Sequence, residues 1–504
     1  MQQRAAFVAI IVLCLPGSCF GYICAQTQDY SFAMDMYWRQ DVVHFNNVVD
    51  LDSSLSNDEV TYIGLDYSLA FTFEQAQEAL KARLVLERNG PTDYDAPIGA
   101  DGRVITSGGQ IKEYRGQALL PQVEELWIQL PFASRARLQA GLYAFEVGNG
   151  LSLNGAYENI GATLSYAWRD LSLRAYYCRP DLVSKSLLGP RIDQDQEQGI
   201  DYESHAAHFF ASDVTISLEE NIINPYVGLL VDYTAPGKRI NLFSAPIKKD
   251  FLGTAGCAFT LKEDNLTWAI EAARNFGKGV SAAADMKDVI HEGFMIYSDI
   301  DYRIDGVVPS FAVLVCSGNE VSTEAALNED DLLSSKNNKA FSAYSPFNLN
   351  LSDSISASHV DIRPVVATGA GYGLNYGLPR PGTFATSDFD NIIIVSLGSD
   401  VALGKKLCIG LFGYYLQSFK RGVGMFEGQP QELSRELGIE ADVFVDYKVN
   451  EHILISLLGG YFVPGNYYRQ HRDDSDGSLL SPFVRGDGHV DNAYQIEVAM
   501  EMTF

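Results

Sequence analysis

NAYQIEVAMEMTF, residues 492–504, is the stretch of sequence that decides the fold. The apolar face of this stretch holds Tyr494, Ile496, Val498, Met500, Met502 and Phe504, and the other face holds Gln495, Glu497, Ala499, Glu501 and Thr503. A strict period of two is typical of a β-strand with one dry and one wet face. A soluble sandwich would rarely end on such a strand. We expect a closed barrel, because its last strand pairs with its first.

The first 25 residues have the pattern of a secretory signal peptide. A basic residue precedes an apolar run over residues 5–15, and small residues suited to cleavage after Gly21 or Ala25 follow. The run is shorter than the roughly 20 residues that a membrane-spanning helix needs, and later apolar stretches are only as long as strands. Because no linker, repeat or low-complexity tract divides the rest, we predict a signal peptide at 1–25 and a single domain at 26–504.

The composition narrows the classes of partner. The 37 Lys and Arg residues stand against 64 Asp and Glu residues, and the net charge is -27. Such a chain repels nucleic acid, so we expect no nucleic-acid partner. Tyr and Phe number 27 each, which suits a large β core or the aromatic girdles of a membrane barrel.

Turn signals and alternation divide the mature chain into strands joined by tight and long connections in turn. Eight tight turns are predicted at residues 75–79, 132–135, 169–170, 220–223, 263–265, 305–306, 404–406 and 450–451. Nine long connections are predicted at residues 44–59, 89–121, 146–157, 179–204, 234–250, 276–292, 317–388, 419–435 and 464–491. Eight plus nine connections join eighteen strands, of which the first is SFAMDMYW at residues 31–38.

An even number of strands of about ten residues, with both ends of the chain on the short-turn side, is what an outer-membrane barrel requires. The sequence therefore predicts an all-β fold: a transmembrane antiparallel up-and-down β-barrel of about 18 strands, with short periplasmic turns and long extracellular loops. The expected location is the cell outer membrane. A soluble sandwich is the alternative, with its wet face toward solvent instead of a water-filled lumen.

Because alternate residues of a strand point to opposite faces, the polar positions of each predicted strand place charged side chains in the lumen. Basic residues on alternate early strands would form one positive wall, and acids would occupy most of the remaining circumference, with one arginine among them. The alternative is that these charges pair with one another for structural reasons. The predicted pore-lining residues are Lys81, Arg83, Arg137, Arg174, Arg303, Asp299, Asp301, Glu440, Asp442 and Glu497.

The longest connection, at about residues 317–388, contains ATGAGYGLNYGLPRPGTF, which is too rich in glycine and aromatic residues for an ordinary solvated loop. Loops longer than about 15 residues are usually functional or disordered. We predict that it folds into or over the outer mouth; the alternative is a variable surface loop. The candidate constriction residues are Arg363, Tyr372, Tyr376 and Arg380.

Catalytic and cofactor motifs were sought because some membrane barrels are enzymes. No phosphate loop, dinucleotide fingerprint, nucleophile elbow or zinc-protease motif occurs. His205 and His208 are three residues apart on a predicted strand, so they point to opposite faces, which argues against a shared metal. We predict no catalytic residue, no metal and no cofactor.

The last third of the chain resembles the alginate export family of outer-membrane porins. The resemblance rests on LGIEADVFVDYKVNEHILISLLGGYFVPGNYY at residues 437–468 with the closing strand, and on EELWIQLPFASRARLQAGLYAFEVGNG at residues 124–150 followed by NIGATLSYAW. It implies an eighteen-stranded barrel and export of an anionic polysaccharide. The family's exporter draws in its substrate through an arginine-rich lumen, and the acid-rich lumen expected here departs from that.

These observations predict a porin that passes a hydrophilic solute or an anionic polysaccharide by passive diffusion through a charged lumen. A structural or adhesive barrel with an occluded lumen is the alternative, and substrate identity and ion preference stay open. The expected partners are outer-membrane lipids and lipopolysaccharide, the hydrophilic solute or polysaccharide, and the barrel insertion machinery, which would bind the C-terminal strand.

Overall fold

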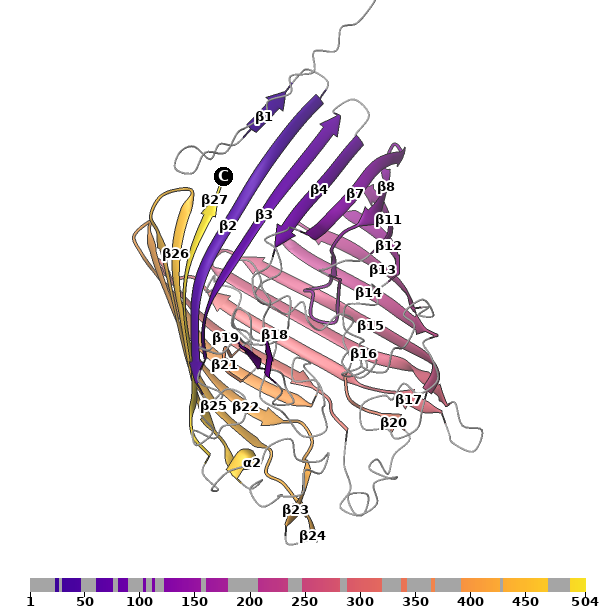
Figure 1. The fold of residues 1–504 in the computed structure, drawn as a ribbon. Helices are drawn as coiled ribbons and strands as arrows, with labels where there is room; N and C mark the ends of the chain where they lie inside the picture. The colour runs from indigo at the N-terminus through magenta and orange to yellow at the C-terminus, as the bar shows by residue number, and fades with distance from the viewer. Residues whose placement is uncertain are drawn as a thin grey trace, which may run out of the picture.

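A single closed sheet dominates the computed structural model of the protein (Figure 1). The structure describes residues 23–26, 30–46, 60–75, 80–88, 103–105, 111–113, 122–155, 160–179, 207–233, 247–281, 288–319, 337–341, 364–367, 391–426, 429–469 and 490–504. The predicted signal peptide lies outside these residues except for residues 23–25, which belong to β1.

In the described part of the chain the sheet has 21 strands. Three of them, β1, β17 and β20, are short additions, so 21 minus 3 leaves the 18 strands of the barrel wall, as predicted. The wall consists of β2 (Tyr30–Asn46), β3 (Val60–Gln75), β4 (Leu80–Arg88), β7 (Gln122–Ala133), β8 (Ala136–Leu142), β11 (Ile160–Trp168), β12 (Leu171–Arg179), β13 (Ala207–Leu218), β14 (Asn221–Asp232), β15 (Ile247–Glu263), β16 (Leu266–Ser281), β18 (Phe294–Tyr302), β19 (Val307–Cys316), β21 (Ile392–Leu403), β22 (Leu407–Ser418), β25 (Glu436–Lys448), β26 (Ile453–Pro464) and β27 (Ala493–Thr503).

Short elements decorate the wall, mainly within the long connections. They are β1 (Ile23–Gln26), β5 (Arg103–Ile105), β6 (Ile111–Glu113), β9 (Phe145–Val147), β10 (Leu153–Gly155), β17 (Val289–His291), β20 (Asn337–Asn338), β23 (Val423–Phe426), β24 (Gln429–Glu432) and the helix α2 (Asn466–Arg469). Figure 1 places β23, β24 and α2 at the lower end of the barrel, opposite the C-terminus.

None of the helices in the described residues is both long and apolar enough to cross a membrane.

The barrel closes between its first and last wall strands, which lie side by side in Figure 1. β2 and β27 pair antiparallel from Tyr37 with Thr503 to Asn46 with Tyr494. Beyond the ladder, Phe504 exchanges two backbone hydrogen bonds of 2.9 Å with Met36. The closing role predicted for the last strand is confirmed, and no wall strand is left with an open edge at this seam.

The pattern of exposure on the wall is the reverse of that in a soluble protein. On β27, Ile496 and Val498 are each 46% exposed, whereas Gln495 and Glu497 are 0% exposed. The wall strands therefore turn apolar side chains outward and polar side chains inward, as a bilayer requires of a barrel. The same outward belt includes Leu126, Ile160, Leu164, Trp168, Ile296, Phe311, Leu397, Leu411 and Ile439. The predicted location in the cell outer membrane agrees with this fold.

The tight turns lie together at one end of the barrel and follow the predicted positions closely. Arg169 and Asp264 adopt left-handed backbone angles in two-residue turns, with φ of 54° and 43°. In the turn at Asp305 and Gly306 both residues have positive φ, which is the type I′ geometry that Asp-Gly favours. The turn predicted at residues 220–223 lies instead at residues 219–220, because Asn221 already begins β14. Residues 76–79 of another predicted turn lie outside the described residues.

The sequence places the end of β16 too early. A long connection was predicted from residue 276, but β16 continues to Ser281. Gly277 and Gly279 on its inner face give this stretch a loop-like composition, while Phe276 and Lys278 continue the outward alternation. Gly277 has a φ of 112°, and a Cβ there would lie 2.1 Å from the carbonyl oxygen of Phe251. Glycine therefore serves a close approach between strands here and does not end the strand.

Candidate functional site in the barrel lumen

The inner wall at the seam carries a buried cluster of charges. Arg39 on β2 contacts the carboxylate of Glu497 on β27, and its Nη1 lies 3.4 Å from Oε1 of Glu501. Asp41, the next inward residue of β2, is 0% exposed beside them. The low exposure of Arg39 and Glu497, 1% and 0%, makes this a desolvated ion pair. Glu497 was predicted to line the pore, and the structure places it at the closing seam.

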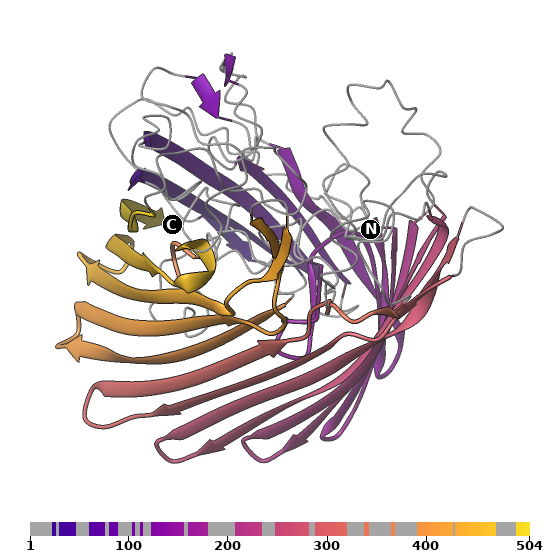
Figure 2. The same cartoon turned by 90° about the horizontal axis from the view of Figure 1, so that it is seen from below.

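The connection between β8 and β11 folds inward onto the wall. Its short hairpin, β9 and β10, packs inside the barrel, where Phe145 stacks on Phe209 with ring centroids 5.6 Å apart. Figure 2, viewed from below, shows the wall strands arranged around this interior. A chain segment in the lumen narrows the path that a solute can take.

Glu271 on β16 holds the tip of this hairpin. Its carboxylate accepts hydrogen bonds from the Asn149 amide at 2.8 Å, from the Ser152 hydroxyl at 2.9 Å and from the Tyr226 hydroxyl at 2.6 Å. Gly148, with a φ of 69°, lies so close that a Cβ would meet the Tyr226 ring at 2.9 Å. The tip is thus fixed by one buried carboxylate and by a glycine that allows close approach.

Residues 364–367 of the longest connection also lie against the inner wall. The Val365 amide donates to Asp442 at 3.0 Å, and the amides of Val366 and Ala367 donate to the two oxygens of Glu440 at 2.5 and 2.8 Å. Glu440 and Asp442 are two residues apart on β25, so both face the lumen. Sequence reasoning assigned these two acids to the pore lining, and the structure shows them holding a loop segment.

The four candidate constriction residues of that connection, Arg363, Tyr372, Tyr376 and Arg380, lie outside the described residues. The adjacent segment at residues 364–367 is buried, with exposures of 0%, 1% and 5% for its last three members. This contact brings part of the connection into the barrel. The gate itself stays a prediction.

Three of the four residues of the predicted basic wall form ion pairs. Lys81 lies 2.7 Å from Glu74, Arg83 lies 3.1 Å from Glu125, and Arg174 makes a two-pronged contact with Asp213 at 3.0 and 2.9 Å. Arg137 is exposed, and the strand register puts it in one row with Ser165 and Arg174. Their parity is inward as expected, and most of the positive charge is compensated locally.

Sequence reasoning missed the acidic partners Glu74, Glu125 and Asp213. Asp213 is 1% exposed and also accepts a 2.8 Å hydrogen bond from Asn224. Each acid lies on the strand next to that of its base. The signal available in the sequence was the alternation that turns each of these acids inward. Which base it meets depends on strand register, which the sequence does not reveal.

The inward acids on β18, β21 and β25 have fewer basic neighbours than those near the basic wall. Asp301, Asp400 and Asp446 are half-buried and form no ion pair with described residues; Asp446 accepts a 2.7 Å hydrogen bond from Ser456. Asp301 and Asp446 are near enough to Asp400 to act on it electrostatically. Asp299 accepts a 3.0 Å hydrogen bond from Tyr297. The inner wall from β18 to β27 is therefore negative at its half-buried positions.

Arg303, which was predicted among these acids, lies in the exposed turn between β18 and β19 at the short-turn end. Its backbone N–H donates to the Asn265 carbonyl at 2.8 Å, and this bond joins two neighbouring turns. The described residues contain no group of three or more His, Cys, Asp or Glu side chains arranged to hold a metal ion.

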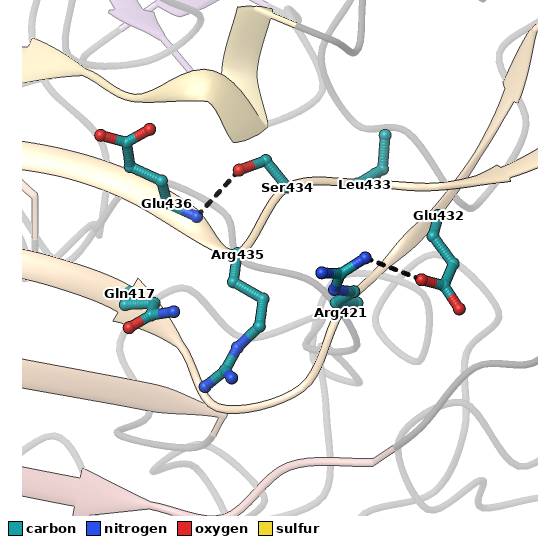
Figure 3. Close-up of a pocket in the computed structure, with 7 residues that line it drawn as sticks. All are labelled: Gln417, Arg421, Glu432, Leu433, Ser434, Arg435 and Glu436. Carbon is teal, nitrogen blue, oxygen red and sulfur yellow. Dashed lines mark hydrogen bonds and ion pairs between the residues drawn. The ribbon is translucent and has the colours of Figure 1, made fainter.

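An open hollow of about 460 Å³ lies at the other end, between the ends of β22 and β25 (Figure 3). Two guanidinium groups line it. Arg421 donates to Glu432 at 2.8 Å, and Arg435 donates to the Ser418 carbonyl at 2.8 Å. These contacts brace the connection between β22 and β25 at the rim, outside the lumen rows described above.

The comparisons with known proteins found matches among solved structures alone. No protein-family model matches the chain, and no curated protein does. Among solved structures, OccAB3 of Acinetobacter baumannii is similar over 94% of this chain and 99% of its own, with 8% identity and a TM-score of 0.49. OccK11 (OpdR) of Pseudomonas aeruginosa is similar over 94% and 96%, with 9% identity and a TM-score of 0.47. OccK2 (OpdF) of the same organism, solved in complex with glucuronate, is similar over 94% and 98%, with 8% identity and a TM-score of 0.47. These values do not place the chain in a family.

Proposed function

We propose that the protein is a passive outer-membrane channel for small hydrophilic solutes. The observation that carries this proposal is the reversed exposure of a closed sheet: apolar side chains such as Ile496 and Val498 face outward, and charged ones such as Glu497 face inward. Only a barrel that separates lipid outside from a polar interior is stable with that arrangement. Such a wall offers a polar path through an apolar slab and needs no cofactor or energy source.

The balance of charge in the lumen favours cations and neutral solutes over anions. Lys81, Arg83 and Arg174 have acidic partners, whereas Asp301 and Asp400 have no counter-ion among the described residues. An uncompensated negative wall raises the local concentration of cations and lowers that of anions. The two loop segments fixed in the lumen favour solutes of small cross-section.

Export of an anionic polysaccharide, as the resemblance to the alginate export family implies, is the second candidate. The observation that favours it is Arg137, an exposed inward arginine that forms no ion pair with the described residues. Its row also contains Arg174, so a carboxylated chain would meet two guanidinium groups. Against it stand the ion pair of Arg174 with Asp213 and the acids opposite.

An occluded structural barrel is a further alternative, which the inward-folded segments favour. Glu271 and Glu440 are 0% and 3% exposed although both lie on the inner wall, so protein covers them. A permanent plug predicts a folded protein that passes nothing. An anchored segment that only narrows the lumen predicts passage limited by size.

Liposome swelling with three sugars of similar size separates these candidates. Glucose is neutral, glucosamine is cationic and glucuronate is anionic, so their rates report charge preference at nearly constant cross-section. The proposal predicts that glucosamine enters at least as fast as glucose and that glucuronate is the slowest. If glucuronate enters fastest, the anionic-substrate candidate replaces the proposal. If correctly folded protein causes no swelling with any of them, the barrel is occluded.

A further inference from the structure

The outer surface of β15 and β16 carries basic side chains where the wall should be apolar. Arg274 and Lys278 are exposed on the outward face of β16, on the same parity as Phe276, which is 44% exposed. Lys249 lies on the outward face of β15, where it pairs in register with Val280. All three cations therefore point to the side of the barrel that faces lipid.

Aromatic side chains frame Lys249. Its Nζ lies 4.3 Å from the ring centroids of both Tyr233 and Phe251. Tyr233 is 46% exposed, so this cation–π arrangement is on the surface. A cation held between two rings at the edge of an apolar belt is positioned at the boundary between the hydrocarbon and the headgroups.

Of the three cations, Lys278 is the one that forms an ion pair with an acidic side chain in the described part of the chain. Its Nζ lies 3.0 Å from Oδ2 of Asp288, in the connection just before β17. The hydrogen bond from Lys278 lowers the pKa of Asp288, so that carboxylate stays charged. This pair leaves the positive charges of Lys249 and Arg274 without an acidic partner among the described residues.

Arg274 is the deepest of the three cations. It pairs in register with Ala255 on one side and Phe294 on the other, so neither neighbour offers a counter-charge. A bare guanidinium on the lipid face is strongly unfavourable at mid-bilayer and is tolerated near the interface. Its long side chain can extend toward the headgroups while its methylene groups remain in the apolar belt.

The strand geometry puts these residues near the outer interface. Lys278 is 12 residues beyond Leu266, the first residue of β16 at the short-turn end (278 minus 266). At about 3.4 Å per residue and a tilt of about 45°, this is a height of roughly 29 Å, against an apolar band of roughly 25 Å. Arg274, four residues lower, lies roughly 10 Å beneath that level by the same geometry. The cations thus form a ladder from the upper apolar belt into the headgroup layer.

We propose that Lys249 and Arg274, the two cations of this ladder that have no acidic partner among the described residues, bind a phosphorylated lipid headgroup of the outer leaflet. The proposal rests on the outer-membrane location given above and is independent of conduction through the lumen. The phosphate groups supply the counter-charges that the described residues do not, and Phe276, which lies between Arg274 and Lys278 on the outward face of β16, contacts the acyl chains at the top of the apolar belt. A headgroup with two phosphates fits best, because the cations lie at different heights on two neighbouring strands, β15 and β16, rather than gathered at one point.

The test measures lipid binding to the refolded barrel in a neutral detergent by native mass spectrometry. Lipid A is the probe, phosphatidylcholine the neutral-headgroup comparison and inorganic phosphate the free-anion competitor. The test variant is Lys249→Gln with Arg274→Gln. The matched control is Lys262→Gln with Lys405→Gln, which removes two exposed cations at the short-turn end. The charge-preserving variant is Lys249→Arg with Arg274→Lys.

Each basic residue near the headgroups contributes roughly a fivefold factor to the affinity. The test variant removes two of them, so it should bind lipid A roughly 25-fold more weakly than wild type. The control and charge-preserving variants should bind within a few-fold of wild type, and phosphatidylcholine should show no difference. Equal binding by test variant and wild type overturns the proposal, as does an equal loss in the control. If millimolar inorganic phosphate displaces lipid A, the site takes free anions and the assignment to a lipid is wrong. Folding is checked by the electrophoretic shift between unheated and boiled protein.

Discussion

Arg39 and Glu497 form a buried ion pair across the seam where the first and last wall strands meet. Arg39 also lies 3.4 Å from Glu501, the residue directly opposite it in the register of β2 and β27. Side-chain and backbone contacts therefore close the barrel together. A cation shared by two acids of one strand also favours this register, because a slip by one residue would turn both acids toward lipid.

Replacing Arg39 with Met should destabilise the barrel strongly. The change leaves Glu497 and Glu501 buried without their cation, and breaking a buried pair in this way costs about 3 to 5 kcal/mol. The measurement is the free energy of unfolding in urea from lipid vesicles. Lys81→Gln is the control, because the exposed pair with Glu74 is worth about 0 to 1 kcal/mol. Equal effects of the two substitutions would contradict the role given to the seam.

Glu440→Gln with Asp442→Asn should release residues 364–367 from the wall. Glu440 accepts from the amides of Val366 and Ala367 with its two oxygens, and a glutamine keeps only one acceptor, so one of these N–H groups loses its partner. With Asp442→Asn the side chain can still accept from Val365, but a neutral amide oxygen is a weaker acceptor than a carboxylate. The expected result is a larger or noisier single-channel conductance. Lys448→Gln is the control on the same strand, because Lys448 is exposed at the short-turn end of β25, far from the loop. If both variants conduct like wild type, these carboxylates do not control the aperture.

Gly148→Ala should loosen the inward hairpin. The new Cβ would lie 2.9 Å from the Tyr226 ring, and the left-handed backbone adds about 1 to 2 kcal/mol of strain. Gly404→Ala is the control, since Gly404 has a φ of 76° but nothing within 4 Å of its position. Limited proteolysis near residues 143–155 reports the effect. We expect faster cleavage for Gly148→Ala than for Gly404→Ala, and equal rates would remove the steric argument.

The strands could be predicted from the sequence because alternation is a local property. β27 and β25 alternate cleanly, and their apolar and polar faces point outward and inward in the structure. The exact end of β16 could not be predicted, because Gly277 and Gly279 resemble a loop unless the neighbouring strand is known. Because Lys278 fell within the predicted connection at residues 276–292, its position on the outward face of β16 could not be predicted either.

The partners of the lumen charges could not be predicted, because they depend on register and on inward-folded segments. Arg174 meets Asp213 across 39 residues of sequence, and Glu440 meets Val366 across 74. Parity places each side chain on a face, but only the closed sheet shows which charges are compensated. For this reason the basic wall predicted from the sequence is largely neutralised by Glu74, Glu125 and Asp213.

Single-channel recording of the refolded protein under a salt gradient tests the central claim most directly. Wild type should conduct steadily, with a reversal potential of the sign given by cation preference. Asp301→Asn with Asp400→Asn should move this potential toward zero, because the variant removes two inner-wall charges that have no ion-pair partner among the described residues. Arg137→Glu with Arg174→Glu should increase the cation preference. A silent bilayer from folded protein, or an anion preference that the aspartate substitutions leave unchanged, would contradict the account.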